Sequence, residues 1–265
     1  MIHEKIVHGD RILEIPGTIN ARDIFANSDM PLEFRGKFFR SAMLNRLSSK
    51  GQAALKDLGV EVVIDLRTKK EVQVDGAARV PHGIEVFVLD QLINPDTPTV
   101  QDYSDPNYLI KRANSVDEQI EIGLRGMRHV YWKFVMAPHY QERFAEALKV
   151  AADYSKVWFN CSAGKDRTGF FAYLIHSIAK TPKPQIFYDY MMSFAVRDLY
   201  ADFFEYDSEH AEKSILETVF TVRPEFLQYS LDTIKENFSS VDGYFEQIGV
   251  DSVVQDKIKN NLEEK

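Results

Sequence analysis

The stretch "VWFNCSAGKDRTGFF", Val157 to Phe171, contains Cys161, the only cysteine among the 265 residues of the chain. A short apolar run precedes the cysteine, and "GFFAYLIHSIAK" (169–180) is apolar nearly all round. The first run is typical of a buried strand and the second of a buried helix. The stretch therefore predicts a strand–loop–helix unit with Cys161 at the carboxyl end of the strand, where open α/β sheets bind ligands.

The residues that follow Cys161 suit a loop that binds an anion. The start of a helix presents unpaired N–H groups and a partial positive charge. Gly164 permits a left-handed turn, and the Arg167 guanidinium matches two oxygens of a phosphate. A free thiol has a pKa of about 8.5, and the helix start, Lys165 and Arg167 all favour its thiolate.

These features predict in-line attack of the Cys161 thiolate on phosphorus. The product would be a cysteinyl-phosphate, which water then hydrolyses. From the first helical turn, the Thr168 hydroxyl can donate a hydrogen bond to the sulfur. The alternative interpretation is that a lone buried cysteine serves only as a small hydrophobic side chain.

The loop is not a nucleotide-binding P-loop. Alignment of the pattern GxxxxGK[ST] with Gly164 and Lys165 requires glycine at position 159 and serine or threonine at position 166. Those positions hold Phe159 and Asp166. The chain also has no HExxH motif and no cysteine–histidine cluster, so we expect no metal ion and no cofactor.

Composition excludes other classes of protein. A formal net charge of −8 disfavours a general nucleic-acid binder. One cysteine cannot form an internal disulfide, which fits a reducing compartment. The sequence shows neither the apolar segment of a signal peptide nor an apolar run of membrane length. We therefore expect a cytoplasmic protein, and secretion without a recognisable signal stays open.

Strand-like and helix-like segments alternate in the first third of the chain. Strands are predicted at 11–15 ("RILEI"), 36–40 ("GKFFR"), 60–66 ("VEVVIDL") and 83–89 ("GIEVFVL"). Helices are predicted at 48–59 ("SSKGQAALKDLG"), 68–73 ("TKKEVQ") and, further along, 140–154. This alternation favours the α/β class, with a central, partly parallel sheet flanked by helices.

Two segments depart from this alternation. Residues 92–130 are rich in Pro, Asp, Asn and Tyr with weak periodicity, and we expect either a variable surface loop or a lid over the site. Residues 184–265 predict a helical C-terminal part of four or five helices, one of them with Pro224 in its first turn. Length and pattern together predict a single domain over residues 1–265.

The segment "CSAGKDRTG" (161–169) resembles the active-site loop of the bacterial tyrosine phosphatase family, within the cysteine-dependent phosphatases. Further similar motifs follow in the family's order: "NARDIF" (20–25), "FFRSAMLNRLSSKG" (38–51), "LGVEVVIDLRTKKE" (58–71), "DYMMS" (189–193) and the C-terminal helices. The resemblance implies a phosphatase whose nucleophile is Cys161 and whose phosphate clamp is Arg167. The other implied phosphate-site residues are Ser162, Ala163, Gly164, Lys165, Asp166 and Thr168.

The resemblance also implies substrates and supporting residues. The family includes enzymes that act on phosphotyrosine and, in several members, on phosphoserine, phosphothreonine or phosphoinositides. Phosphorylated proteins or phosphoinositides are therefore the expected substrates, inorganic phosphate is the product, and Lys165 suits extra phosphate charge. Arg22 and Arg40 follow the family pattern and are interpreted as buttresses of the site. The family usually has histidine before the nucleophile, whereas this chain has Asn160, which can order the loop by hydrogen bonds but carries no charge.

Asp166 is the first candidate for the general acid. A carboxylate beside a dianionic phosphate is repelled unless it is protonated or has a task in catalysis. The resemblance to the phosphatase family also indicates Asp166 as the acid. The alternative is a structural ion pair with Arg22, Arg40 or Lys165.

Asp65, at the end of a predicted strand, is the second candidate, because strand ends converge on the site. Its alternative is a turn cap or a partner for Arg67. That arginine could equally pair with Glu71, four residues further along. Three weaker candidates are Asp90, Asp102 and Asp105.

Two other functions would use similar features. A phosphate-recognition module without turnover would bind through the same loop, and Asn160 is the residue that raises this possibility. A sulfurtransferase or an arsenate reductase also uses a cysteine at a strand-to-helix turn. The lack of a second cysteine disfavours an arsenate reductase, and the "AGKDRTG" run (163–169) disfavours a rhodanese-like loop.

Overall fold

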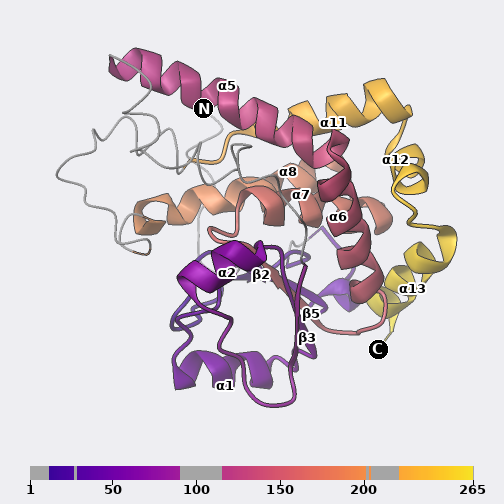
Figure 1. Ribbon diagram of the computed structural model, residues 1–265. Coiled ribbons are helices and arrows are strands. Elements are labelled where there is room, and N and C mark those ends of the chain that lie inside the picture. Colours follow the sequence, from indigo (N-terminus) through magenta and orange to yellow (C-terminus); the bar gives the residue numbers. More distant parts are fainter. Residues whose placement is uncertain (1–11, 27–28, 90–114, 201–202, 204–220, 265) are drawn as a thin grey trace.

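The fold is built on a five-stranded sheet in the computed structural model, which describes residues 12–26, 29–89, 115–200, 203 and 221–264. In spatial order the strands are β1 (Arg22–Asp23), β2 (Phe38–Ser41), β5 (Val157–Asn160), β3 (Val62–Asp65) and β4 (Glu85–Val88). β1 pairs antiparallel with β2, and the remaining neighbours are parallel. The expected α/β class with a partly parallel sheet is therefore confirmed (Figure 1).

The central strand β5 places the start of the loop at one edge of the sheet. All four residues of β5 are buried. Its last residue, Asn160, lies opposite Ser41 of β2 on one side and Asp65 of β3 on the other. Because these three strands run parallel, their carboxyl ends meet at the same edge, and Cys161 begins the loop there.

Successive side chains of the strands enter two different apolar clusters. On β5, Val157 and Phe159 pack into the larger cluster, and Trp158 between them packs into the smaller one. Helix α1 (Ser49–Asp57) contributes Leu55 to the smaller cluster. The sheet is therefore covered on both faces, as is usual for parallel strands.

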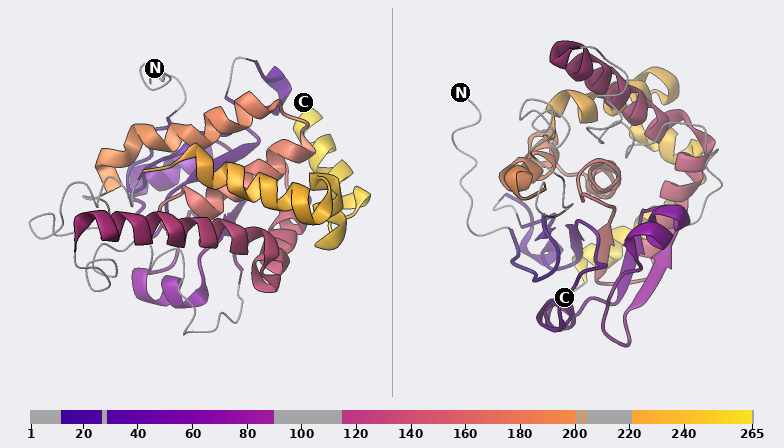
Figure 2. Two further views of the ribbon diagram at one scale, coloured as in Figure 1. Left: turned by 90° about the horizontal axis from the view of Figure 1, so that it is seen from above. Right: turned by 60° about the vertical axis from the view of Figure 1, so that its left-hand side comes forward.

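Helix α7 (Asp166–Ile178) lies within the larger cluster, and every one of its residues is buried. Its Phe170 ring lies 5.8 Å from Phe134 and 5.0 Å from Phe144, centroid to centroid. Figures 1 and 2 show α7 between the sheet on one side and α5 and α11 on the other. The further helices are α5 (Val116–Met136), α6 (Pro138–Ala151), α8 (Lys183–Met191), α11 (Pro224–Phe238), α12 (Val241–Gln247) and α13 (Ser252–Glu263).

Helix ends follow the local signals in the sequence. Ser48 caps α1 by accepting a hydrogen bond from the Gly51 N–H, and Gly59 follows the helix with a φ of 74°. Pro224 is the first residue of α11, as predicted. The expected helical C-terminal part is confirmed by α8, α11, α12 and α13, together with the short 3-10 helix η3 (Met192–Leu199).

Two expectations need correction. Within 11–15, Ile12 forms only an isolated bridge with Arg22, and Arg11 lies outside the described residues. Within 92–130, residues 92–114 also lie outside them, but the part from Val116 onward is helix α5, so a loop or lid was the wrong prediction there. The buried face of this half of α5 includes a glutamine and two glycines, which concealed the apolar periodicity.

None of the helices in the described part of the chain combines the length and the apolar composition needed to cross a membrane. The longest of them, α5, has acidic residues in its first turn and a lysine in its last turn. It instead packs extensively against α11, next to α7.

Candidate active site

The loop from Cys161 to Arg167 connects β5 to α7 and packs against the end of β2. Gly164 has a φ of 68°, and a Cβ atom at this position would lie 2.3 Å from the carbonyl carbon and oxygen of Ser41. The left-handed conformation and the close approach both require glycine. The loop is buried, since Cys161 is 3% exposed and Arg167 is 4% exposed.

Four consecutive carbonyl groups of the loop, in residues 162–165, accept hydrogen bonds from donors outside it. The N–H of Met43 donates to the first carbonyl at 3.1 Å. Asn20 Nδ2 donates to the second at 3.4 Å and to the third at 2.8 Å. Arg40 Nη2 donates to the third at 2.9 Å and to the fourth at 3.4 Å. The loop therefore turns a continuous row of carbonyl oxygens outward.

The outward carbonyls determine where the N–H groups of the loop point. In a trans peptide the N–H points opposite to the C=O of the same unit, and the loop has only trans peptides. The N–H groups of residues 163–166 therefore point away from the surrounding donors, toward the inside of the loop. Successive N–H groups that converge in this way form a concavity for an anion, to which the N-terminus of α7 adds partial positive charge.

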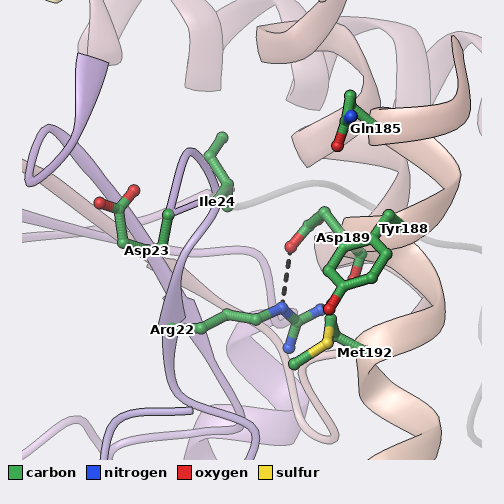
Figure 3. A pocket seen from close by; sticks show the side chains of 8 residues that line it. Arg22, Asp23, Ile24, Gln185, Tyr188, Asp189 and Met192 are labelled. Atoms are coloured by element: carbon green, nitrogen blue, oxygen red, sulfur yellow. Dashed lines mark hydrogen bonds and ion pairs between the residues drawn. The ribbon is translucent and has the colours of Figure 1, made fainter. Parts of the chain in front are cut away.

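Behind the loop, Asp189 of α8 holds both arginines that were predicted to buttress the site. Arg22 Nε donates to Asp189 Oδ1 at 2.8 Å, and Arg40 Nη1 donates to Asp189 Oδ2 at 2.5 Å. Figure 3 shows Arg22 and Asp189 joined by this contact, in the lining of a small pocket between β1 and α8. Burial by itself would raise the pKa of Asp189, but the charges of Arg40 and Arg22 lower it to about 2. This network is therefore ionised at neutral pH.

The Arg167 guanidinium is held by Glu71 of α2 (Lys69–Asp75). Arg167 Nη1 donates to Glu71 Oε2 at 2.7 Å, and Arg167 Nη2 donates to Glu71 Oε1 at 2.6 Å. Ser162 Oγ also donates to Glu71 Oε1, at 3.0 Å. The same Glu71 forms a capping box with Thr68 at the start of α2. Burial would raise the pKa of Glu71, but the charge and hydrogen bonds of Arg167 lower it to about 2.

Asp65 is fully buried at the end of β3 and accepts hydrogen bonds from Arg67, the shortest at 2.7 Å. It also accepts one from Asn160 Nδ2 at 3.1 Å. The expected alternative for Asp65, a partner for Arg67, is present in the structure. The other possibility for Arg67, an i,i+4 pair with Glu71, is not formed, because Glu71 pairs with Arg167 instead.

Asp166, the first residue of α7, lies at the centre of a second polar cluster. Its Oδ2 is 2.8 Å from Lys165 Nζ, and its Oδ1 accepts a hydrogen bond from the Tyr131 hydroxyl at 2.9 Å. The Tyr131 hydroxyl lies 2.7 Å from that of Tyr190. Of the three ion pairs considered for Asp166, the structure forms the one with Lys165.

The predicted hydrogen bond from Thr168 to the sulfur of Cys161 is not formed. Within the described part of the chain, neither Thr168 Oγ1 nor Arg167 Nε has a hydrogen-bond partner, although both atoms are buried. Buried donors in native proteins are nearly always paired. An anion held by the loop would supply acceptors on this side of α7.

Comparison with known proteins assigns a family to this arrangement. A sequence profile with the description "Tyrosine phosphatase family" matches residues 13–264, nearly the whole chain. The chain belongs to the tyrosine phosphatase family. This phosphatase is therefore a phosphoric monoester hydrolase, and its substrates are phosphorylated compounds.

Two bacterial relatives extend the comparison. The phosphatase is 30% identical to "Triple specificity protein phosphatase PtpB" of Mycobacterium tuberculosis over 279 aligned positions, which cover 95% of this chain and 99% of the relative. It is 32% identical to a "Tyrosine-protein phosphatase" of Nostoc commune over 161 positions, which cover 59% of this chain and 48% of that relative. The first similarity extends over nearly the full length of both proteins.

Most of the predicted site residues of the phosphatase, from Cys161 to Thr168, form the loop after β5 and the first turn of α7. Asp65 lies behind this loop and contacts Asn160, the residue before it. Three weaker acid candidates lie outside the described residues: Asp90, Asp102 and Asp105. In the described ranges, no three His, Cys, Asp or Glu side chains are grouped to hold a metal ion.

Four residues around the loop were missed as site residues: Glu71, Asp189, Tyr131 and Tyr190. Thr68 and Glu71 form the T-x-x-E pattern of a capping box, so the helix start was readable. No local signal shows that the Glu71 carboxylate also reaches Arg167, because that contact joins positions far apart in the sequence. Likewise, no local signal in the sequence shows that Tyr131 and Tyr190 lie close to Asp166.

We expect Gly164→Ala to destabilise the phosphatase by about 2–4 kcal/mol, since it combines left-handed strain with overpacking against β2. Gly36→Ala is the matched control. Gly36 has a similar φ of 73°, but a Cβ atom there would meet nothing within 4 Å. Urea unfolding of both variants measures the difference, and equal losses of stability would show that the close approach to Ser41 is unimportant.

We expect Glu71→Gln to lower the free energy of unfolding by about 3 kcal/mol at neutral pH, because it leaves the buried Arg167 charge uncompensated. The folded-state pKa of Glu71 is about 2, against an ordinary value of 4.5. The ionised pair therefore stabilises the fold above about pH 4.5, and this contribution is lost as the pH falls toward 2. Urea titrations at several pH values measure the gap between the two proteins. Thr68→Ala, which removes the helix cap but keeps the Glu71 carboxylate, is the control. A difference in the free energy of unfolding between the wild type and Glu71→Gln that stays constant in acid would contradict the assignment.

We expect Asn160→His to shift the pH profile of Cys161 alkylation by iodoacetamide toward lower pH. An imidazolium beside the loop favours the thiolate, whereas the amide of Asn160 carries no charge. Asn160→Ala, which removes the hydrogen bond to Asp65 without adding charge, is the control. Superimposable profiles for the wild type and the histidine variant would show that the charge at this position has no influence.

Proposed function

We propose that this phosphatase hydrolyses phosphate monoesters through a covalent cysteinyl-phosphate, with Cys161 as nucleophile. The Cys161 thiolate attacks phosphorus, and the bond from phosphorus to the leaving-group oxygen breaks as the S–P bond forms. Water then attacks the phosphorus of the intermediate, the S–P bond breaks, and inorganic phosphate leaves. The thiolate is regenerated, so no external reductant is consumed.

One observation carries this proposal, namely the row of outward carbonyls in residues 162–165. It leaves the N–H groups of residues 163–166 directed into the loop that Cys161 begins, where a phosphate would accept from several of them. Arg167 adds a guanidinium whose orientation Glu71 determines through two hydrogen bonds. Donors that are already oriented need no reorganisation when charge develops on the transferred phosphoryl group.

Asp166 is our candidate for the general acid that protonates the leaving group. It follows the loop directly as the first residue of α7, whereas Asp65 lies at the end of β3 and is held by Arg67. We assign to Asp65 a positioning role, because its hydrogen bond with Asn160 joins the ends of β3 and β5 directly before Cys161. A general acid typically contributes about 10²–10⁴-fold to the rate.

Phosphotyrosine is the proposed principal substrate, and phosphoserine, phosphothreonine and phosphoinositides are further candidates. The Mycobacterium tuberculosis relative is named a triple specificity protein phosphatase. Its alignment over 95% of this chain supports a test of each of these substrate classes here. We also propose that residues 13–264, which the family profile matches, act as one phosphatase domain.

We expect the wild type to hydrolyse 4-nitrophenyl phosphate in the presence of a metal chelator, and Cys161→Ser to lose at least about 10³-fold of that rate. The wild type should then release phosphate from a phosphotyrosine peptide. Binding of inorganic phosphate by both proteins, measured by calorimetry, controls for folding of the loop. If the wild type binds phosphate but shows no turnover at any pH from about 5 to 8, a phosphate-recognition module is favoured instead. Asn160 is then the first residue to substitute.

A further inference from the structure

Two buried tyrosines reach Asp166 from helices outside the strand–loop–helix unit. Tyr131 comes from α5 and Tyr190 from α8, and they are 0% and 1% exposed. The Tyr131 hydroxyl donates to Asp166 Oδ1 at 2.9 Å and lies 2.7 Å from the Tyr190 hydroxyl. The three side chains therefore form one continuous hydrogen-bonded chain that ends at the catalytic loop.

The direction of hydrogen-bond donation among the three side chains follows from their chemistry. The Tyr131 hydroxyl donates to Asp166 Oδ1, because this carboxyl oxygen has no hydrogen to offer while Oδ2 faces Lys165. Its own oxygen is then free to accept the hydrogen bond of Tyr190. Burial above all, and then the charge of Asp166, raises the pKa of Tyr131 well above its ordinary value. Tyr131 therefore stays protonated, and remains a donor, throughout the neutral range.

The two oxygens of Asp166 have different partners as a result. Oδ1 is bound by Tyr131, and Oδ2 is paired with Lys165 Nζ at 2.8 Å. The ring of Tyr131 cannot easily rotate, because it packs against Phe134 and Phe226 with centroids 5.1 and 5.6 Å away. Lys165 by contrast holds its partner with a flexible side chain, so Oδ2 is the oxygen that can change partner.

We propose that Tyr131, supported by Tyr190, is a positioning residue for Asp166. By holding Oδ1, it orients the carboxyl so that Oδ2 carries the proton for the leaving group. The proposal rests on the proposed function, in which Asp166 is the general acid. Proton transfer from Oδ2 requires that Lys165 turns to another anion, which the phosphate of the substrate supplies. Oδ2 then takes up a proton from solvent in place of its contact with Lys165, and it passes this proton to the leaving-group oxygen.

The test compares two substrates that differ in their need for an acid. Nitrophenolate is a good leaving group and needs little protonation, whereas phenolate is a poor one and depends on it. We expect Tyr131→Phe, which removes one hydroxyl and keeps the ring, to lower kcat about tenfold more for phenyl phosphate than for 4-nitrophenyl phosphate. Tyr190→Phe should widen the gap between the substrates in the same direction by a smaller factor.

Tyr244→Phe is the matched control for loss of a buried hydroxyl. Tyr244 is fully buried, and its hydroxyl donates to the Phe134 carbonyl of the same helix α5 at 3.2 Å. A purely structural defect in α5 should lower kcat for both substrates by the same factor. If Tyr131→Phe behaves like Tyr244→Phe, the positioning role is overturned.

Asp166→Asn separates this inference from the function on which it rests. We expect Asp166→Asn to lower kcat more for phenyl phosphate than for 4-nitrophenyl phosphate, and this difference should be larger than in Tyr131→Phe. A gap in Asp166→Asn together with equal losses in Tyr131→Phe would leave Asp166 as the acid and remove the role of Tyr131. Equal losses in Asp166→Asn would show that Asp166 is not the acid, and both assignments would then fall. Should Tyr131→Phe fail to fold, Tyr190→Phe decides the question by the same comparison.

Discussion

The conformation of the loop after Cys161 depends on hydrogen bonds to its carbonyl oxygens. A free loop would turn some carbonyls inward, where they would repel an anion. Asn20, Met43 and Arg40 prevent this by donating hydrogen bonds to the carbonyls of residues 162–165. Of these donors only Arg40 is charged, and a charged donor makes a stronger hydrogen bond than a neutral one. The proposed anion site is therefore shaped from the outside, by groups that need not touch the anion.

Three buried carboxylates around the loop hold arginines, and each carboxylate serves a different part of the loop. Asp189 holds Arg22 and Arg40 behind the carbonyls, Glu71 holds Arg167 beside the anion site, and Asp65 holds Arg67 next to Asn160. Buried ion pairs add little net stability compared with apolar packing, because desolvation of the charges is costly. Their benefit here is orientation, since each carboxylate restricts a guanidinium to one position. Removal of either partner therefore leaves a buried charge without its counter-charge.

The helices outside the core motif contribute to the site as well as to the fold. α5 and α8 pack against α7, and they also place Tyr131 against Asp166, Tyr190 against Tyr131, and Asp189 against the arginines behind the loop. α2 contributes Glu71 through the same residue that caps its first turn. The site therefore draws on three helices besides the strand–loop–helix unit, which couples the geometry of the loop to the packing of the whole cluster.

The sequence by itself determined the strand–loop–helix unit, the α/β class and the positions of most helices, because these depend on local pattern. Apolar runs, the cap at Ser48, the helix start at Pro224 and the glycine at position 164 act over a few residues. Where the pattern was weak, as in the first half of α5, the helix was missed, because its buried face includes a glutamine and glycines. Only the tertiary structure decided which carboxylate pairs with which cation. Glu71 lies four residues from Arg67 but binds Arg167, because the parallel strands β3 and β5 bring distant chain segments together at one edge of the sheet.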